Sequence, residues 1–182
     1  MEDARTVAYR LFSDCISKLF GSYVDEAPQV RPLADPEIRN PLDGLTHDFD
    51  RQLEMVSSSI GLGSDEMRCS IGLLAHVTTV QAVCEHDVEN PTDWMGELAN
   101  QLMGRMKNCL AEYGVVARMG MPVSVRGMQM GFTSPTAHQT AMCADLEAGR
   151  IVAVLHLEVG PGVTWQHDPN RAHVDEGSFC LF

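Results

Sequence analysis

The clearest hydrophobic pattern in the chain lies between residues 93 and 113. Apolar side chains recur there at steps of three and four residues, which is the period of an amphipathic helix with one buried side. Gly114 follows as a stop signal, and Thr92 or Asp93 is placed to cap the first turn. The pattern predicts a long helix that buries Met95, Leu98, Ala99, Leu102, Met106, Cys109, Leu110 and Tyr113.

The opposite side of this predicted helix carries a carboxylate, an amide and a glycine. At about 100° per residue, Glu97 and Asn100 lie about 60° apart, and Gly104 falls within about 20° of Glu97 two turns on. A glycine inside a helix costs about 1 kcal/mol relative to alanine, which suggests that Gly104 lets another surface come close. The alternative is a solvated helix face with a tolerated glycine, since Glu and Asn are ordinary on exposed helices.

Alternation with a period of two predicts strands in the rest of the chain. Met67, Cys69, Ile71 and Leu73 alternate with polar or small residues, as in a half-buried strand. Residues 53–62 predict its partner, and further strands are predicted at 115–121, 123–132, 139–146 and 151–159, the last two joined by a turn at 147–150. The fold class that follows is α+β: a long antiparallel β-sheet with a layer of two to three helices on one face.

The remaining segments define the domain organisation that we expect. Residues 4–20 predict a short amphipathic helix ended by Gly21, and residues 76–86 predict another helix. Prolines at 28, 32, 36 and 41 predict an extended connector. We therefore expect an N-terminal helix (1–22), a Pro-rich connector (23–50) and one domain with a C-terminal tail (51–182). The terminal Phe179-Cys180-Leu181-Phe182 predicts a tail that docks on the domain or adds a strand; the alternative is an exposed partner-binding end.

The net charge of the protein limits the classes of binding partner that we expect. The 182 residues carry a formal net charge of −12, which argues against binding nucleic acid or anionic lipid through a broad basic surface. Residues 98–144 differ from the rest, because Arg105, Lys107, Arg118 and Arg126 face the single acid Glu112 there. This local excess of positive charge indicates either a docking face for an acidic or phosphorylated partner or scattered surface charge.

The spacing of the cysteines and the first residues of the chain indicate the cellular compartment that we expect. The six cysteines include no Cys-x-x-Cys pair, so neither a zinc knuckle nor a thioredoxin-type site is supported. The first residues do not form a secretory n-region, and no apolar run is long enough to span a bilayer. We expect a cytoplasmic protein without a membrane segment, in which the cysteines are small core residues.

The long helix and its surroundings resemble a known family. The segment with Asp93, Gly96-Glu97-Leu98-Ala99-Asn100 and Gly104, followed by Pro122 and Gly127 on a strand-like run, is similar to the CheC/CheX/FliY chemotaxis phosphatases, and to CheX most closely. The resemblance covers about residues 53–160 and rests on order and context more than on long identity. In that family the helix carries a Glu-x-x-Asn pair, and this chain has one credible copy, as in CheX.

The resemblance implies an activity and roles for the matching residues. It implies a phosphatase that hydrolyses the aspartyl phosphate of a CheY-like response regulator, with Glu97 pairing with the regulator's active-site lysine and Asn100 orienting the attacking water. Gly104, with Arg105 and Lys107, would belong to the partner-binding face. The Mg²⁺ would be supplied by the regulator, so no cofactor or metal of the chain's own is expected, and a homodimer formed by sheet extension is implied.

Two alternatives stay open at this point. The first is a non-catalytic module on the same fold that binds a receiver domain or sits in a flagellar switch. The second, outside the family, is a small-molecule-binding α+β domain, which would need a deep apolar pocket. Both site residues projecting outward, side by side, would favour the phosphatase.

Overall fold

The chain is described by a computed structural model over residues 1–23, 29–33, 54–83, 90–128, 130, 139–169 and 171. Within these residues the helices are α1 (Ala4–Phe20), α3 (Val77–Val83) and α4 (Pro91–Ala111). The strands are β1 (Glu2–Asp3), β2 (Gln29–Pro32), β3 (Glu54–Gly63), β4 (Met67–His76), β5 (Arg118–Met119), β6 (Val123–Met128), β7 (Gln139–Leu146), β8 (Gly149–Val159) and β9 (Thr164–Trp165).

The strands other than β1 and β9 form one antiparallel sheet with the order β2-β7-β8-β4-β3-β5, and β6 also pairs with β3. The three longest strands, β3, β4 and β8, lie side by side in its centre, and β4 is paired along its length on both sides. The predicted hairpin at the end of the chain is present as β7 and β8, whose register closes at Leu146 opposite Gly149. The predicted fold class, an α+β protein with a long antiparallel sheet, is therefore confirmed.

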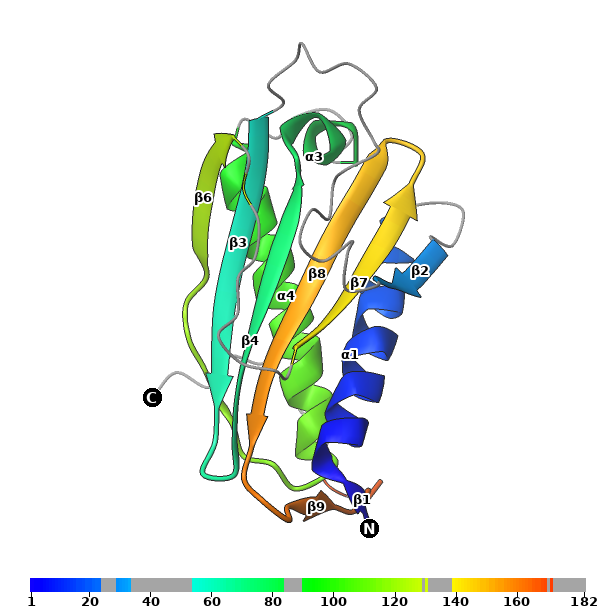
Figure 1. The fold of residues 1–182 in the computed structure, drawn as a ribbon, viewed down its shortest axis with the longest axis vertical. Helices are drawn as coiled ribbons and strands as arrows, with labels where there is room; N and C mark the ends of the chain where they lie inside the picture. Colours follow the sequence, from blue (N-terminus) through cyan, green and yellow to red (C-terminus); the bar gives the residue numbers. More distant parts are fainter. Residues whose placement is uncertain are drawn as a thin grey trace.

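Helices α1 and α4 cover one face of the sheet, as Figure 1 shows, with α1 behind β7 and β8 and α4 behind β3 and β4. Strand alternation explains which side chains meet them, because every second residue points to the helices. On β8 these are Ile151, Ala153, Leu155 and Leu157, all at most 1% exposed. Helices and sheet therefore share one core.

The opposite face of the sheet carries a second apolar cluster. Its members come from alternating positions of the same strands: Leu33, Met55, Leu74, Ala141, Cys143, Val152 and Val154. Each is less than a tenth exposed. The central strands are therefore buried on both faces, which explains why residues 151–155 form one continuous apolar run rather than a strict alternation.

An ion-pair cluster ties three strands together at the sheet's far edge. Asp145 on β7 accepts hydrogen bonds from Arg150 on β8, at 2.6 Å, and from Arg31 on β2, at 3.2 Å. Partial burial pushes the pKa of Asp145 up, but the bonds from Arg150 and Arg31 outweigh it and hold that pKa below its ordinary value. The two guanidinium groups thus help to fix β2 on the edge of β7.

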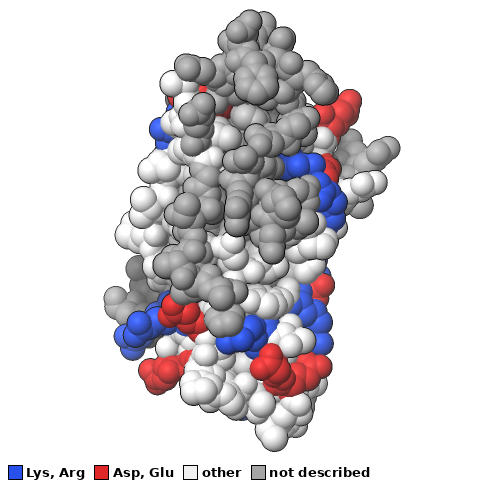
Figure 2. Space-filling view, viewed as in Figure 1, with Lys and Arg blue, Asp and Glu red and all other residues white. Residues whose placement is uncertain are grey.

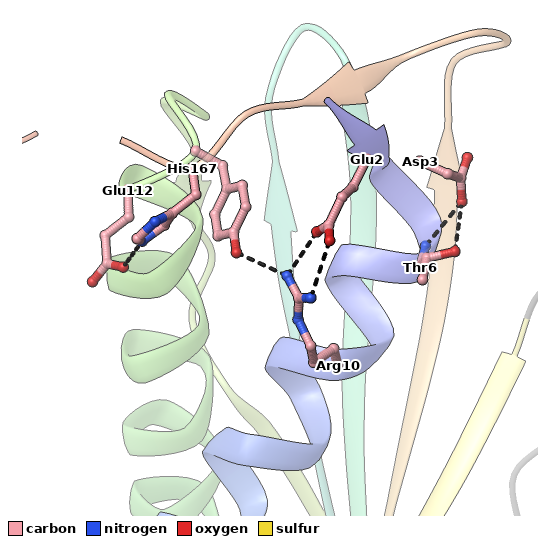
Figure 3. Close-up of polar contacts among 7 residues, drawn as sticks. Glu2, Asp3, Thr6, Arg10, Glu112 and His167 are labelled. Carbon is pink, nitrogen blue, oxygen red and sulfur yellow. Dashed lines mark hydrogen bonds and ion pairs between the residues drawn. The ribbon is translucent and has the colours of Figure 1, made fainter. Parts of the chain in front are cut away.

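The first turns of α1 lie beside the C-terminal end of α4, where β1 pairs with β9 (Figure 3). Asp3 caps α1 by accepting from the Thr6 backbone N–H and hydroxyl, both at 3.0 Å. Arg10 binds the Glu2 carboxylate and donates to the Tyr113 hydroxyl beyond the end of α4. His167 contacts Glu112 at 3.0 Å. These exposed contacts connect the first residues to residues 164–167.

Several sequence predictions need correction here. The cap of α4 is neither Thr92 nor Asp93 but Asn90, whose side-chain oxygen accepts from the Thr92 N–H at 3.1 Å. Of the strand predicted over 115–121 only β5 is present, because residues 115–117 and 120–121 lie outside the ladder. Strand β9 was not predicted, and β2 lies inside the predicted connector. The rest of the connector, the 84–86 end of the predicted helix and the terminal Phe182 segment lie outside the described residues.

Buried thiols fit the prediction that the cysteines serve as core residues. Cys15, Cys69 and Cys143 are all less than a tenth exposed. Burial raises the pKa of Cys69 to about 12, so this thiol stays protonated and unreactive at neutral pH. Cys15 lies with its sulfur 3.9 Å from that of Cys109, across the packed helices α1 and α4.

Among the described helices, none combines the length and the apolar character that a membrane-spanning segment requires.

The observed cap of α4 generates the first prediction. Asn90→Ala removes the oxygen that satisfies the Thr92 N–H and is expected to lower the free energy of unfolding by about 1 kcal/mol. Thr92→Ala, at the position that the sequence suggested, is the matched control and is expected to cause no loss. Urea unfolding followed by circular dichroism measures both; equal losses for the two variants would contradict the assigned cap.

Candidate functional site

The apolar stripe of α4 decides which of its residues can reach a partner. Its buried side chains, each at most 1% exposed, are Met95, Leu98, Ala99, Leu102, Met103, Met106 and Leu110. They pack against the sheet and against α1. The side of α4 about 180° away, which starts at Glu97, is therefore turned out of the core, as the sequence pattern predicted.

Gly96 sets how closely α4 approaches β6. It is buried, and a Cβ atom there would lie 2.9 Å from the Oγ of Ser124 on β6. The Ser124 hydroxyl donates to the hydroxyl of Ser58 on β3 at 3.0 Å, and Ser58 is fully buried. The bare glycine thus leaves room for a hydroxyl pair beneath the helix, which a larger residue would displace.

The structure places the two predicted catalytic residues on the outward side of α4. Glu97 is exposed and Asn100 is half-buried, one helical turn apart. The Asn100 amide makes no hydrogen bond to the residues that the structure describes. Neither side chain belongs to the buried stripe of α4, and their roles stay a prediction.

A hydrogen-bonded pair of side chains adjoins Glu97 on the side of α4 toward α1. The Gln101 Nε2 donates to Glu97 Oε1 at 3.2 Å, and the Tyr23 hydroxyl donates to Gln101 Oε1 at 2.9 Å. The Tyr23 ring packs edge-on against Trp94, with ring centres 5.7 Å apart. Glu97 is thus exposed but not isolated, since a chain of contacts leads from it to the end of α1.

The three residues predicted for the partner-binding face differ in their surroundings. Gly104 is half-exposed, and a Cβ atom added there would meet nothing within 4 Å. The fold itself does not need this glycine, in contrast to Gly96. Lys107 is exposed and Arg105 is half-buried, on either side of the line from Glu97 to Gly104. The structure therefore places Gly104 on the outward side of α4, with Lys107 and Arg105 on its two opposite flanks.

The local excess of basic residues does not form one continuous surface. Arg126 on β6 is paired with Glu54 on β3, and the hydrogen bond from Arg126 lowers the pKa of Glu54. On the face drawn in Figure 2, the coloured basic and acidic residues lie interspersed rather than in a patch of one sign. Of the four basic residues, Arg126 thus lies in an ion pair on the sheet, whereas Arg105 and Lys107 lie on α4.

Two residues that contact each other near Glu97 were not predicted from the sequence. Gln101 lies four residues after Glu97, the spacing at which helical side chains meet, so its contact could have been proposed from the sequence. Tyr23 is 78 residues from Gln101 and no local signal joins them.

Sequence comparisons do not identify the chain: no protein-family model and no curated protein matches it. Comparison with solved structures does find similar folds. A CheC-like superfamily protein from Shewanella sp. PV-4 is 18% identical, with a TM-score of 0.65 over 84% of this chain and 97% of that one. CheX from Vibrio vulnificus is 19% identical, with a TM-score of 0.63 over 83% of this chain and 99% of that one.

A third similar structure is a CheX-CheY-BeF3-Mg²⁺ complex from Borrelia burgdorferi. It is 16% identical, with a TM-score of 0.60 over 83% of this chain and 97% of that one. At these identities the likeness is one of fold. The protein is an α+β protein with the fold of the CheC- and CheX-like chemotaxis proteins, which confirms the fold that the sequence resemblance implied.

The contrast between the two glycines of α4 generates the second prediction. Gly104→Ala adds a methyl group in open space and is expected to raise the free energy of unfolding by about 0.5–1 kcal/mol, the usual gain in a helix interior. Gly96→Ala is the matched comparison, because the same gain is opposed by the contact with Ser124 and the loss of its bond to Ser58. Thermal or urea unfolding distinguishes them; equal gains would contradict the packing described at Gly96.

Proposed function

We propose that this protein is a CheX-like phosphatase that hydrolyses the aspartyl phosphate of a CheY-like response regulator. The observation that supports the proposal is that Glu97, which is exposed, and Asn100, which is half-buried, lie one turn apart on α4 outside its buried stripe. The CheC/CheX fold and the presence of CheY in the complex of a similar protein support it.

The reaction needs little from the catalyst beyond positioning. A water attacks phosphorus in line with the P–O bond to the aspartate; that bond breaks, the aspartate carboxylate leaves with the bonding electrons, and inorganic phosphate forms after the water loses a proton. An acyl phosphate is already activated, so holding the water at the correct angle supplies most of the acceleration. The Asn100 amide can accept from the water and donate to a phosphate oxygen without adding negative charge, whereas a carboxylate there would be repelled.

Glu97 and the residues around it serve recognition in this proposal. The exposed Glu97 carboxylate pairs with the regulator's active-site lysine, which fixes the register in which Asn100 enters the regulator's site. Gly104 leaves space for the approaching chain. Arg105 and Lys107 add positive charge beside it, which suits a partner that carries a phosphoryl group.

The Mg²⁺ in this proposal belongs to the regulator, where it neutralises the phosphoryl oxygens. The complex of the similar Borrelia protein contains Mg²⁺ together with CheX and CheY. Asn100, an uncharged amide, can share a phosphoryl group with such an ion without competing for it as a carboxylate would. The proposal also places this protein in the cytoplasm, together with the CheY-like regulator on which it would act.

A test of the site compares two variants in one assay. Asn100→Ala is expected to lower kcat for release of phosphate from a phosphorylated receiver domain by about 100-fold, toward the receiver's spontaneous rate, because the water loses its orienting group. Glu97→Ala is expected to weaken binding of the receiver about 10-fold, with a smaller effect on kcat. Phosphate release with radiolabelled receiver measures both.

Asn108→Ala provides the control, because Asn108 is half-buried on the same helix, two turns beyond Asn100. It is expected to leave turnover unchanged. Parent-like rates for both Asn100→Ala and Glu97→Ala would overturn the site. Tight binding of the receiver without acceleration by the parent protein would instead favour the non-catalytic, receiver-binding module.

We also propose that the protein forms a homodimer through the edge of the sheet at β6. Among the described strands, β6 pairs with β3 alone, and its Val123 and Val125 are 66% and 51% exposed. Unpaired strand edges with apolar side chains readily pair with a second chain, and a charged residue there opposes it. Val125→Lys is expected to convert the dimer to a monomer in sedimentation velocity, with unchanged circular dichroism. A parent protein that sediments as a monomer would refute this dimer.

A further inference from the structure

The Glu97 carboxylate is connected to α1 by two successive hydrogen bonds. Tyr23 Oη donates to Gln101 Oε1, and Gln101 Nε2 donates to Glu97 Oε1. Tyr23 lies just beyond the last residue of α1, so the connection joins two helices that are far apart in sequence.

The direction of these bonds is fixed by chemistry. An ionised carboxylate accepts hydrogen bonds and donates none, so it requires the nitrogen side of the Gln101 amide. The amide oxygen then faces away from Glu97 and accepts from the Tyr23 hydroxyl. All donors thus point the same way, toward the carboxylate, an arrangement in which each bond strengthens the next.

The far end of this chain of bonds is anchored by packing. The Tyr23 ring is half-buried and meets Trp94 at an interplanar angle of 71°, the edge-to-face geometry that aromatic rings prefer. Trp94 itself packs against the main core. A hydroxyl fixed in this way holds the Gln101 amide in one orientation, and the amide in turn restricts the rotation of the exposed Glu97 side chain.

Only one oxygen of Glu97 is used by this arrangement. The bond from Gln101 goes to Oε1, and Oε2 makes no hydrogen bond to the residues that the structure describes. A carboxylate held by one oxygen presents the other to an incoming cation in a defined direction. Because its rotamers are restricted beforehand, less side-chain entropy is lost when the cation binds.

We propose that Gln101 and Tyr23 are positioning residues that hold the Glu97 carboxylate ready for a cationic group of the partner protein. This inference rests on the proposed function, in which that group is a lysine of the receiver domain. Gln101 and Tyr23 act through Glu97 and touch neither the phosphoryl group nor the water. They therefore affect how tightly the partner binds, while Asn100 determines how fast the bound phosphoryl group is hydrolysed.

The experiment is a double-mutant cycle on receiver binding. Gln101→Ala and Tyr23→Phe are each expected to raise the Kd for the beryllofluoride- and Mg²⁺-loaded receiver about 3- to 10-fold, with kcat nearly unchanged. In a Glu97→Ala background both substitutions are expected to have no further effect, because the carboxylate that they hold is gone. In an Asn100→Ala background their full effect on Kd is expected to remain.

Control variants exist on both helices. Tyr9→Phe removes a hydroxyl from α1 that makes no hydrogen bond to the described residues, and Asn108→Ala shortens a polar side chain on α4. Both are expected to leave Kd unchanged. An NMR readout of the free protein adds a test that needs no receiver, since Tyr23→Phe is expected to shift the side-chain amide resonances of Gln101 and Tyr9→Phe is not.

The outcomes separate this inference from the proposed function. If Glu97→Ala weakens binding while Gln101→Ala and Tyr23→Phe do not, or if their effects persist without Glu97, the positioning role is overturned and the proposed function stands. If the parent protein neither binds nor dephosphorylates a receiver, the proposed function fails and the positioning role fails with it. Unchanged Gln101 amide resonances in Tyr23→Phe would overturn the hydrogen-bonded connection itself.

Discussion

Burial of the apolar stripe of α4 between the sheet and α1 is the constraint on which the rest of the structure and the candidate site depend. Seven of its side chains, from Met95 to Leu110, are at most 1% exposed, so α4 cannot rotate about its axis without exposing them to water. That fixed rotation turns Glu97 outward. The candidate functional residues of α4 lie on the side that hydrophobic burial leaves free.

The flanks of α4 are set by two different kinds of contact. On the β6 side, Gly96 allows the helix backbone to lie close to Ser124, above a buried pair of serine hydroxyls. On the α1 side, Tyr23 reaches Gln101 through a hydrogen bond. The outward ridge is thus held by close packing on one flank and by polar contacts on the other. Such support from rigid elements is what a site needs if it works by positioning.

In the function that we propose, the chemistry of the partner explains why the candidate site combines one charged and one neutral group. A carboxylate suits a cationic group but is repelled by a phosphoryl group, whereas an amide serves water and phosphate alike. Separation of the two by one helical turn lets them address different parts of a single pocket. Gly104, with no neighbour within 4 Å of an added Cβ, leaves the next turn open for the chain that carries this pocket.

Periodicity in the sequence determined the long strands, the β7–β8 hairpin, helices α1 and α4, and the outward side of α4, because each depends on which residues must avoid water. The resemblance to CheX-like proteins pointed to the same fold. Tertiary structure alone decided the pairing of β1 with β9, the short β5 and the contact of Tyr23 with Gln101. The cap at Asn90 also needed the structure, since neighbouring residues of similar capping propensity competed for it. Local patterns report burial, but contacts between residues far apart in the chain exist only after the chain has packed.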